Sequence, residues 1–193
     1  YYLNLRLDKN ELDLIYNIIK KSVLRSVKKY SPDYYKIIKN INLKDYHKFS
    51  KKLDQANICN KKNRSFKSHE VSMIKNLKFF KNLTKIFDTS KLATSVNQNE
   101  EIDYRVVRPN QNSDIGSMHA DEWFWKLNNF KSEKKSYERV KCWVPIIIEK
   151  GKNGLRYIPK SHKMNIKYSS FKDNSIGILK PKKILNEKKY RKV

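Results

Sequence analysis

One short segment of this chain brings together residue types that bind metal ions. His119 and Asp121 are separated by a single residue in the run MHADEWFW, residues 118–125. On an extended segment, alternate residues face the same side, so the imidazole and the carboxylate would be neighbours. With a distant second histidine, such a pair would complete the facial triad that binds iron(II) in non-haem oxygenases. Taken alone, the pair better suits a surface histidine in a turn, so its surroundings decide.

Several motifs follow one another along the chain around this pair. The β-prone run YRVVRP (104–109) precedes it, and WVPI (143–146) and NGLRYIPKSHK (153–163) follow it. This ordered set resembles the phytanoyl-CoA dioxygenase family of iron(II)- and 2-oxoglutarate-dependent oxygenases. In that family a strand leads into His-x-Asp, a tryptophan-bearing strand follows, and an Asn-Gly turn precedes a Pro-Gly-Ser-His-Lys-like segment. The resemblance covers about residues 101–165, and Lys160 stands where the last segment has glycine.

The resemblance implies roles for the residues in and after the pair. His119 and Asp121 would bind Fe(II), with 2-oxoglutarate as cosubstrate and O₂ as oxidant. Trp125 stands where family members often place an aromatic residue lining the cosubstrate pocket, although ordinary core packing is an equal alternative. If the segment is a strand, Trp123 lies on the same side as Asp121 and would contact the substrate. The implied reaction is oxidative hydroxylation of a small organic molecule.

Two arginines and a second histidine extend the expected site. Arg105 and Arg108 would bind an anionic cosubstrate or substrate through charge-assisted hydrogen bonds, or would form salt bridges with Asp103 or Asp114. His162 is a candidate third iron ligand, although the histidine of this segment is not normally a ligand in the family. The family's distal histidine and its 2-oxoglutarate-binding arginine come later, and no histidine follows His162. We therefore expect the closing strands of the barrel to lie beyond this sequence; the alternative is a natural short variant that has lost the iron chemistry.

The first half of the chain predicts helices. Apolar residues recur every three or four positions between 10 and 29 and again between 70 and 87, which is typical of one helical stripe. Ser31 and Pro32 predict a stop and the start of a short helix over 34–41. His47 and His69 fall within this lysine-rich helical sequence, where solvated side chains are expected.

From residue 101 onward the sequence favours strands. Residues 102–107 alternate apolar and polar side chains, and 141–148 form a second β-rich run. The Gly151–Gly154 segment predicts a turn into a strand over 155–158, which would place Trp143 in a hairpin. Between 160 and 193 no strong period survives, and we expect a loop there. The expected fold is α+β: a double-stranded β-helix (jelly-roll, cupin-like) core in 99–193 with the helices of 1–98 packed outside, forming one oxygenase-like domain over 1–193.

The formal charge of +25 raises a second class of function. It fits a polyanionic partner such as RNA or DNA, or a lysine-rich background that covers solvated faces. Residues 100–122 depart from this lysine-rich composition, since they include six acidic and two basic residues. The rival hypotheses are a non-catalytic basic nucleic-acid-binding protein and a nucleic-acid-directed oxygenase of the same superfamily. Cys59 and Cys142 form no CxxC pair, and no signal peptide or membrane span is evident, so we expect a cytoplasmic location.

Overall fold

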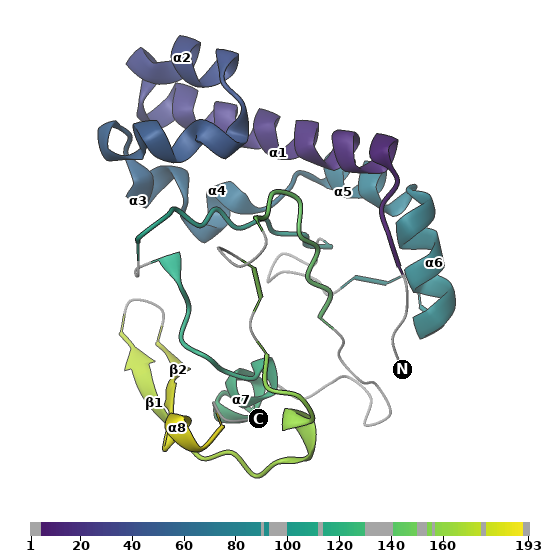
Figure 1. Cartoon of the computed structure of the whole chain (residues 1–193), viewed down its shortest axis with the longest axis vertical. Helices are drawn as coiled ribbons and strands as arrows, with labels where there is room; N and C mark the ends of the chain where they lie inside the picture. Colours follow the sequence, from purple (N-terminus) through teal and green to yellow (C-terminus); the bar gives the residue numbers. More distant parts are fainter. Residues whose placement is uncertain are drawn as a thin grey trace. The chain divides into compact units, whose positions relative to one another are not determined.

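The structure is a computed structural model that describes residues 5–89, 91–92, 100–111, 114–129, 141–149, 154–155, 157–174 and 177–190. The chain divides into two units between Asp114 and Ile115, and Figure 1 shows their elements. Segment 100–114 thus belongs with the helices rather than with the rest of the expected β-rich part. Each unit is described by itself.

The first unit is helical, as the apolar spacing predicts. Its elements are α1 (Lys9–Tyr30), η1 (Pro32–Tyr34), α2 (Tyr35–Asn40), η2 (Leu43–Lys52), α3 (Gln55–Ile58), α4 (Lys61–Arg64), α5 (Ser68–Lys75) and α6 (Lys78–Phe87). A capping box begins α1, since the Asp8 carboxylate accepts from the Glu11 amide and the Glu11 carboxylate accepts from the Asp8 amide. The face of α1 that carries Ile15, Val23 and Val27 is buried.

The helix expected over 70–87 is interrupted in the structure. Helix α5 ends before Asn76 and α6 begins after Leu77. The cause is a side chain distant in sequence: Oε1 of Glu11 accepts a hydrogen bond from the Phe79 amide at 2.8 Å. This bond satisfies one of the amides that a helix leaves unpaired at its N-terminus. The packing of α1 therefore decides where α6 starts.

The run 102–107 is extended, and its hydrogen bonds attach it to the helical unit. The Phe66 amide donates to the Ile102 carbonyl at 3.0 Å, and the Tyr104 amide donates to the Arg64 carbonyl at 3.1 Å. Ser65 and Asp103 form an isolated antiparallel bridge. In addition, the Tyr104 ring stacks on Phe66 with 5.5 Å between ring centroids. These contacts explain why the first unit extends past residue 98.

The second unit contains a short helix and a β-hairpin. Its elements are α7 (Asp121–Leu127), η4 (Ser161–Lys163), β1 (Tyr168–Asp173), β2 (Ile178–Ile184) and α8 (Glu187–Tyr190). Strands β1 and β2 are antiparallel, with a shift in register between Ser169 and Ser170, where Pro181 lies opposite. A proline cannot donate to the ladder, so an irregularity is expected there. The loop expected over 160–193 is therefore wrong for 168–184, where lysines mask the strand pattern.

The larger β architecture remains a prediction. Within the described ranges, the two-stranded sheet of β1 and β2 is the one sheet assigned, and the double-stranded β-helix is not shown. Residues 141–149 carry no assigned strand. Residues 151–153, which include most of the predicted turn, lie outside the described residues, so the hairpin around Trp143 also stays a prediction. None of the described helices is both long and apolar enough to cross a membrane.

Candidate functional site

The His-x-Asp pair lies at the start of α7. Ala120 has an extended backbone and precedes the helix, whose first residue is Asp121. Nε2 of His119 lies 3.7 Å from Oδ1 of Asp121, and the two side chains are 40% and 31% exposed. Two atoms that each lie about 2.1 Å from one zinc-sized ion are at most about 4.2 Å apart. The imidazole and the carboxylate are thus close enough to share an ion.

The local backbone differs from the expected strand. Helix α7 begins at Asp121. The two acidic residues in its first turn stabilise the helix, because they lie at the positive N-terminal end of the helix dipole. The Lys126 ammonium and the Glu122 carboxylate also form an i,i+4 ion pair at 2.6 Å, which stabilises the helix. The expectation that Trp123 shares a strand face with Asp121 and Trp125 is therefore wrong. Instead, Trp125 lies four residues after Asp121, on the same side of the helix.

Trp123 has a packing role in the structure. Its indole stacks on the ring of Tyr168 in β1, with 4.2 Å between centroids and 5° between planes. Asn128, just past the end of α7, adds two bonds to β2: its amide nitrogen donates to the Leu179 carbonyl at 2.8 Å, and its oxygen accepts from the Leu179 amide at 2.9 Å. These contacts hold α7, and with it Asp121, against the hairpin.

The hydrogen bonds of His119 define its tautomer. Nδ1 lies 2.6 Å from the Ser117 carbonyl oxygen, which can only accept, so Nδ1 carries a proton. Nε2 is then the nitrogen that faces Asp121. The nearby Asp121 carboxylate raises the pKa of His119 above its ordinary value, against the opposing effect of burial. The His119 ring, together with Lys141, in turn lowers the pKa of Asp121.

Lys141 is a member of this cluster that the sequence did not single out. Its Nζ lies 3.1 Å from both carboxylate oxygens of Asp121. The Lys141 side chain is 73% exposed, so it can leave without disturbing a packed core. An ammonium and a metal ion would compete for this carboxylate. The lysine-rich background hid the residue, because no local pattern separates Lys141 from its many neighbours of the same type.

A third metal ligand is not supplied by the described residues, where no group of three His, Cys, Asp or Glu side chains could hold an ion. His162 lies in η4 and is exposed. The preceding Lys160 has a left-handed backbone, with φ 58° and ψ 15°. Glycine adopts that conformation without strain. The backbone at Lys160 therefore has the conformation that a glycine would favour, although the residue is a lysine.

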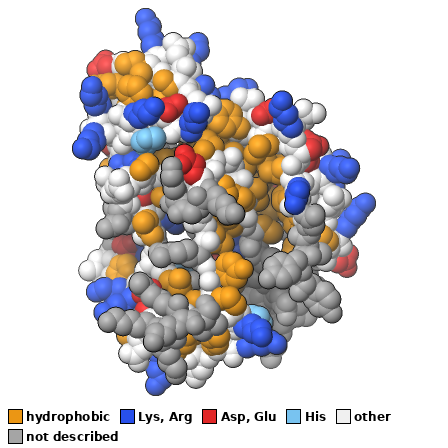
Figure 2. Space-filling model, viewed as in Figure 1, with side chains coloured by type: hydrophobic (Ala, Val, Ile, Leu, Met, Phe, Trp, Pro, Cys, Tyr) orange, Lys and Arg blue, Asp and Glu red, His pale blue; other side chains and the backbone are white. Residues whose placement is uncertain are grey.

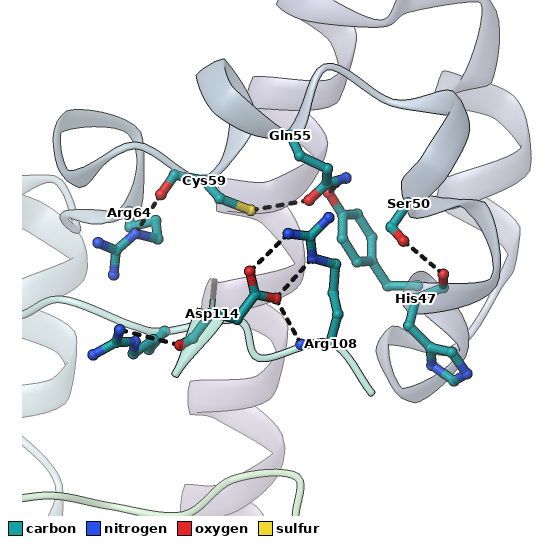
Figure 3. A network of polar contacts seen from close by, with 9 residues as sticks. His47, Ser50, Gln55, Cys59, Arg64, Arg108 and Asp114 are labelled. Carbon is teal, nitrogen blue, oxygen red and sulfur yellow. Dashed lines mark hydrogen bonds and ion pairs between the residues drawn. The ribbon is translucent and has the colours of Figure 1, made fainter. Parts of the chain in front are cut away.

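Arg105 and Arg108 both donate hydrogen bonds to Asp114, and Figure 3 shows Arg108 beside the Asp114 carboxylate. Arg108 donates to its carboxylate from Nε and Nη2, each at 2.7 Å, and from its own amide at 2.9 Å. Arg105 donates to the Asp114 carbonyl at 3.1 Å. The hydrogen bond to Asp114 also raises the pKa of Arg108. Of the two roles expected for Arg108, the structure shows the salt bridge with Asp114. The Asp114 carboxylate therefore already balances the charge of the Arg108 guanidinium.

The same network includes a half-buried thiol, that of Cys59 (Figure 3). Sγ of Cys59 donates to the Gln55 side chain at 3.3 Å, whose amide nitrogen donates to the Tyr46 hydroxyl at 2.8 Å. Burial raises the pKa of the Cys59 thiol and that of the Tyr46 hydroxyl. A protonated, half-buried thiol is a poor nucleophile, so this network serves packing. His47 and His69 are exposed, as expected for solvated residues.

No family model matches the chain, and neither a curated protein nor a solved structure matches it.

Proposed function

We propose that the protein is an iron(II)- and 2-oxoglutarate-dependent oxygenase that hydroxylates a small organic molecule, with His119 and Asp121 as iron ligands. The observation that carries the proposal is the 3.7 Å approach of the imidazole to the carboxylate. A second contact supports it: the Ser117 carbonyl holds the Nδ1 proton at 2.6 Å. Metal-binding histidines commonly have such a partner, which fixes the ring and leaves Nε2 for the ion.

The donor set suits iron(II). One imidazole and one carboxylate are two of the three ligands of the facial triad, in which the remaining positions stay open for cosubstrate and O₂. Iron(II), when bound, would supply the redox chemistry that couples oxidation of 2-oxoglutarate to substrate hydroxylation. Trp125, one turn after Asp121 on α7, is proposed to line the cosubstrate pocket.

The residues of the chain set two conditions for metal binding. His119 must first lose the proton from Nε2, because only the neutral ring offers a lone pair. Asp121 must exchange the Lys141 ammonium, 3.1 Å away, for the ion. The first condition favours binding at higher pH, because a proton and the metal ion compete for Nε2. We also propose a cytoplasmic location, since Cys59 and Cys142 are both free thiols.

The test measures iron(II) binding without oxygen and succinate formation with oxygen and 2-oxoglutarate. The variants are His119→Ala and Asp121→Ala, with His69→Ala, an exposed histidine of α5, as the matched control. Loss of one ligand is expected to weaken binding by about a hundredfold or more, on the order of 3 kcal/mol. The control should bind as the original chain does.

Iron(II) binding that survives both His119→Ala and Asp121→Ala would contradict the proposal. Iron-dependent succinate formation that neither change affects would contradict it as well. A His162→Ala variant adds a separate decision. If it abolishes binding to the same degree as His119→Ala, His162 is the third ligand. If it leaves binding unchanged, His162 is not a ligand.

A further inference from the structure

One face of α1 is lined with donors instead of apolar side chains. The residues follow each other at helical spacing: Ser22, Arg25, Ser26, Lys29 and Tyr30. Opposite them lie α4 and the segment after it, which contribute Lys62, Asn63, Ser65 and Lys67. Figure 1 shows α4 beside α1. Together these nine residues enclose an open cleft of about 200 Å³ within the first unit, called the cationic cleft below.

The base of the cationic cleft is built from well-packed residues. Ser22 is 2% exposed and Ser26 is 6% exposed, so both are fixed by their surroundings. Arg25 is held by Glu70, which accepts from its two terminal nitrogens at 2.6 and 3.0 Å. Glu70 is itself only 3% exposed. A guanidinium has more N–H donors than the two that Glu70 occupies, so Arg25 keeps donors for a ligand while its orientation is set.

The charge of the cationic cleft is unbalanced. Four of its residues are basic and none is acidic. Of these, Lys29, Lys62 and Lys67 form no ion pair within the described part of the chain. Lys29 lies over the Tyr30 ring, 4.8 Å from its centroid. Of the acidic residues that contact this lining, Glu70 pairs with Arg25 and Glu101 pairs with Lys61. Asp103 accepts a hydrogen bond from the Ser65 hydroxyl and keeps its negative charge, so the three unpaired lysines outnumber it.

The surroundings of the Tyr30 hydroxyl favour negative charge. A hydrogen bond from Asn63 lowers the pKa of its hydroxyl, and the ammonium groups of Lys29 and Lys62 lower it further. Each of these groups favours negative charge on the phenol oxygen. An anion placed among them would be stabilised by the same donors and charges.

We propose that the cationic cleft binds the phosphate group of a small phosphorylated molecule. A phosphate matches the donors by chemistry, since it accepts hydrogen bonds from guanidinium, ammonium and hydroxyl groups together. A small ligand fits better than a nucleic acid, because strand binding needs a basic groove that follows many phosphates. On the face of the helical unit seen in Figure 2, Lys and Arg side chains stand apart among acidic and apolar ones. The site is independent of His119 and Asp121 and requires no iron.

The experiment titrates the full chain, without metal, by calorimetry at an ionic strength of about 0.15 M. The probes are inorganic phosphate, glucose 6-phosphate, glucose and single-stranded oligothymidylate. We expect inorganic phosphate and glucose 6-phosphate to bind and glucose not to bind. A Lys29→Gln/Lys62→Gln double variant should weaken phosphate binding by about tenfold, which corresponds to about 1.4 kcal/mol. These lysines form no described ion pair, so the fold should persist.

The matched control is a Lys36→Gln/Lys39→Gln double variant. Both lysines are exposed on α2, outside the cationic cleft, and their loss changes the net charge equally. The control should bind phosphate within about twofold of the original chain, because distant surface charges are largely screened at this salt concentration. The proposal is overturned if neither phosphate nor glucose 6-phosphate binds, or if both double variants weaken binding equally. It is also overturned if only the oligonucleotide binds, which would indicate a nucleic-acid surface.

Discussion

Nε2 of His119 lies 3.7 Å from Oδ1 of Asp121, and its Nδ1 is held 2.6 Å from the Ser117 carbonyl. The two contacts fix the ring from both sides. Because the carbonyl can accept but not donate, the proton on Nδ1 is set by the fold and the state of Nε2 is set by pH. The pair is thus ready to exchange one proton for one metal ion.

The pKa of His119 provides the first prediction. The Asp121 carboxylate raises this pKa above the ordinary value of 6.5, so Asp121→Asn should lower it. Lys141 has the opposite effect on His119, so Lys141→Ala should raise it. Titration of the ring by NMR measures both. The ion pair stabilises the fold below the ordinary pKa, and this stabilisation is lost as pH rises through the raised value. An unchanged pKa in Asp121→Asn would rule out the pairing.

Glu70 provides a prediction for acid stability. Burial alone would raise its pKa, but the bonds from Arg25 and from the Lys67 amide outweigh burial and lower it. Its contribution to the free energy of unfolding is therefore present above the ordinary value of 4.5 and lost as pH falls through the lowered value. Glu70→Gln should cost about 1–3 kcal/mol near neutral pH.

Urea unfolding at several pH values measures this effect. The Glu70→Gln chain should lose less stability between about pH 5 and pH 3 than the original chain, because its side chain no longer titrates. Asp13→Asn, an exposed change on α1, is the matched control and should follow the original chain. Parallel acid curves for the Glu70→Gln and original chains would show that Glu70 carries no such linkage.

Asp114→Asn should weaken the contact between Asp114 and Arg108 and so loosen the extended segment to which Arg108 belongs. The change removes a charge that accepts three bonds from Arg108. We expect a loss of about 1–3 kcal/mol and faster hydrogen exchange at the Tyr104 amide, which bonds the Arg64 carbonyl. Asp88→Asn, at the exposed end of α6, is the control. Full protection of Tyr104 in Asp114→Asn would mean that the segment is held by other contacts.

Asn128→Asp tests how α7 is attached to the hairpin. The substitution keeps the size of the side chain but replaces its amide donor by an acceptor. It removes the bond to the Leu179 carbonyl and places a negative charge beside that oxygen. Stability of the second unit should fall by about 1–3 kcal/mol, measured by thermal unfolding with the fluorescence of stacked Trp123. Asn129→Asp, its exposed neighbour, should have little effect. Equal effects of the two changes would exclude a specific role for Asn128.

The sequence by itself determined the elements that depend on local interactions. The apolar spacing over 10–29 predicted α1. In the structure this helix begins at Lys9, after a capping box formed by Asp8 and Glu11. The stop near Ser31 and the short helix after it were predicted for the same reason. The closeness of His119 and Asp121 also followed from the sequence, since the single residue between them, Ala120, has an extended backbone that leaves both side chains on one side.

Tertiary contacts decided the rest. Glu11 sets the start of α6 across 68 residues of sequence, and Asn128 pairs with Leu179 across 51 residues. Helix α7 and the hairpin of β1 and β2 are short, and short elements are marginal without packing partners. Lysines hide the strand pattern of β1 and β2, and the stacking of Trp123 on Tyr168 and the bonds of Asn128 hold α7 against the hairpin. Lys141 likewise reaches Asp121 from 20 residues away, a partnership that long-range folding created and local sequence could not specify.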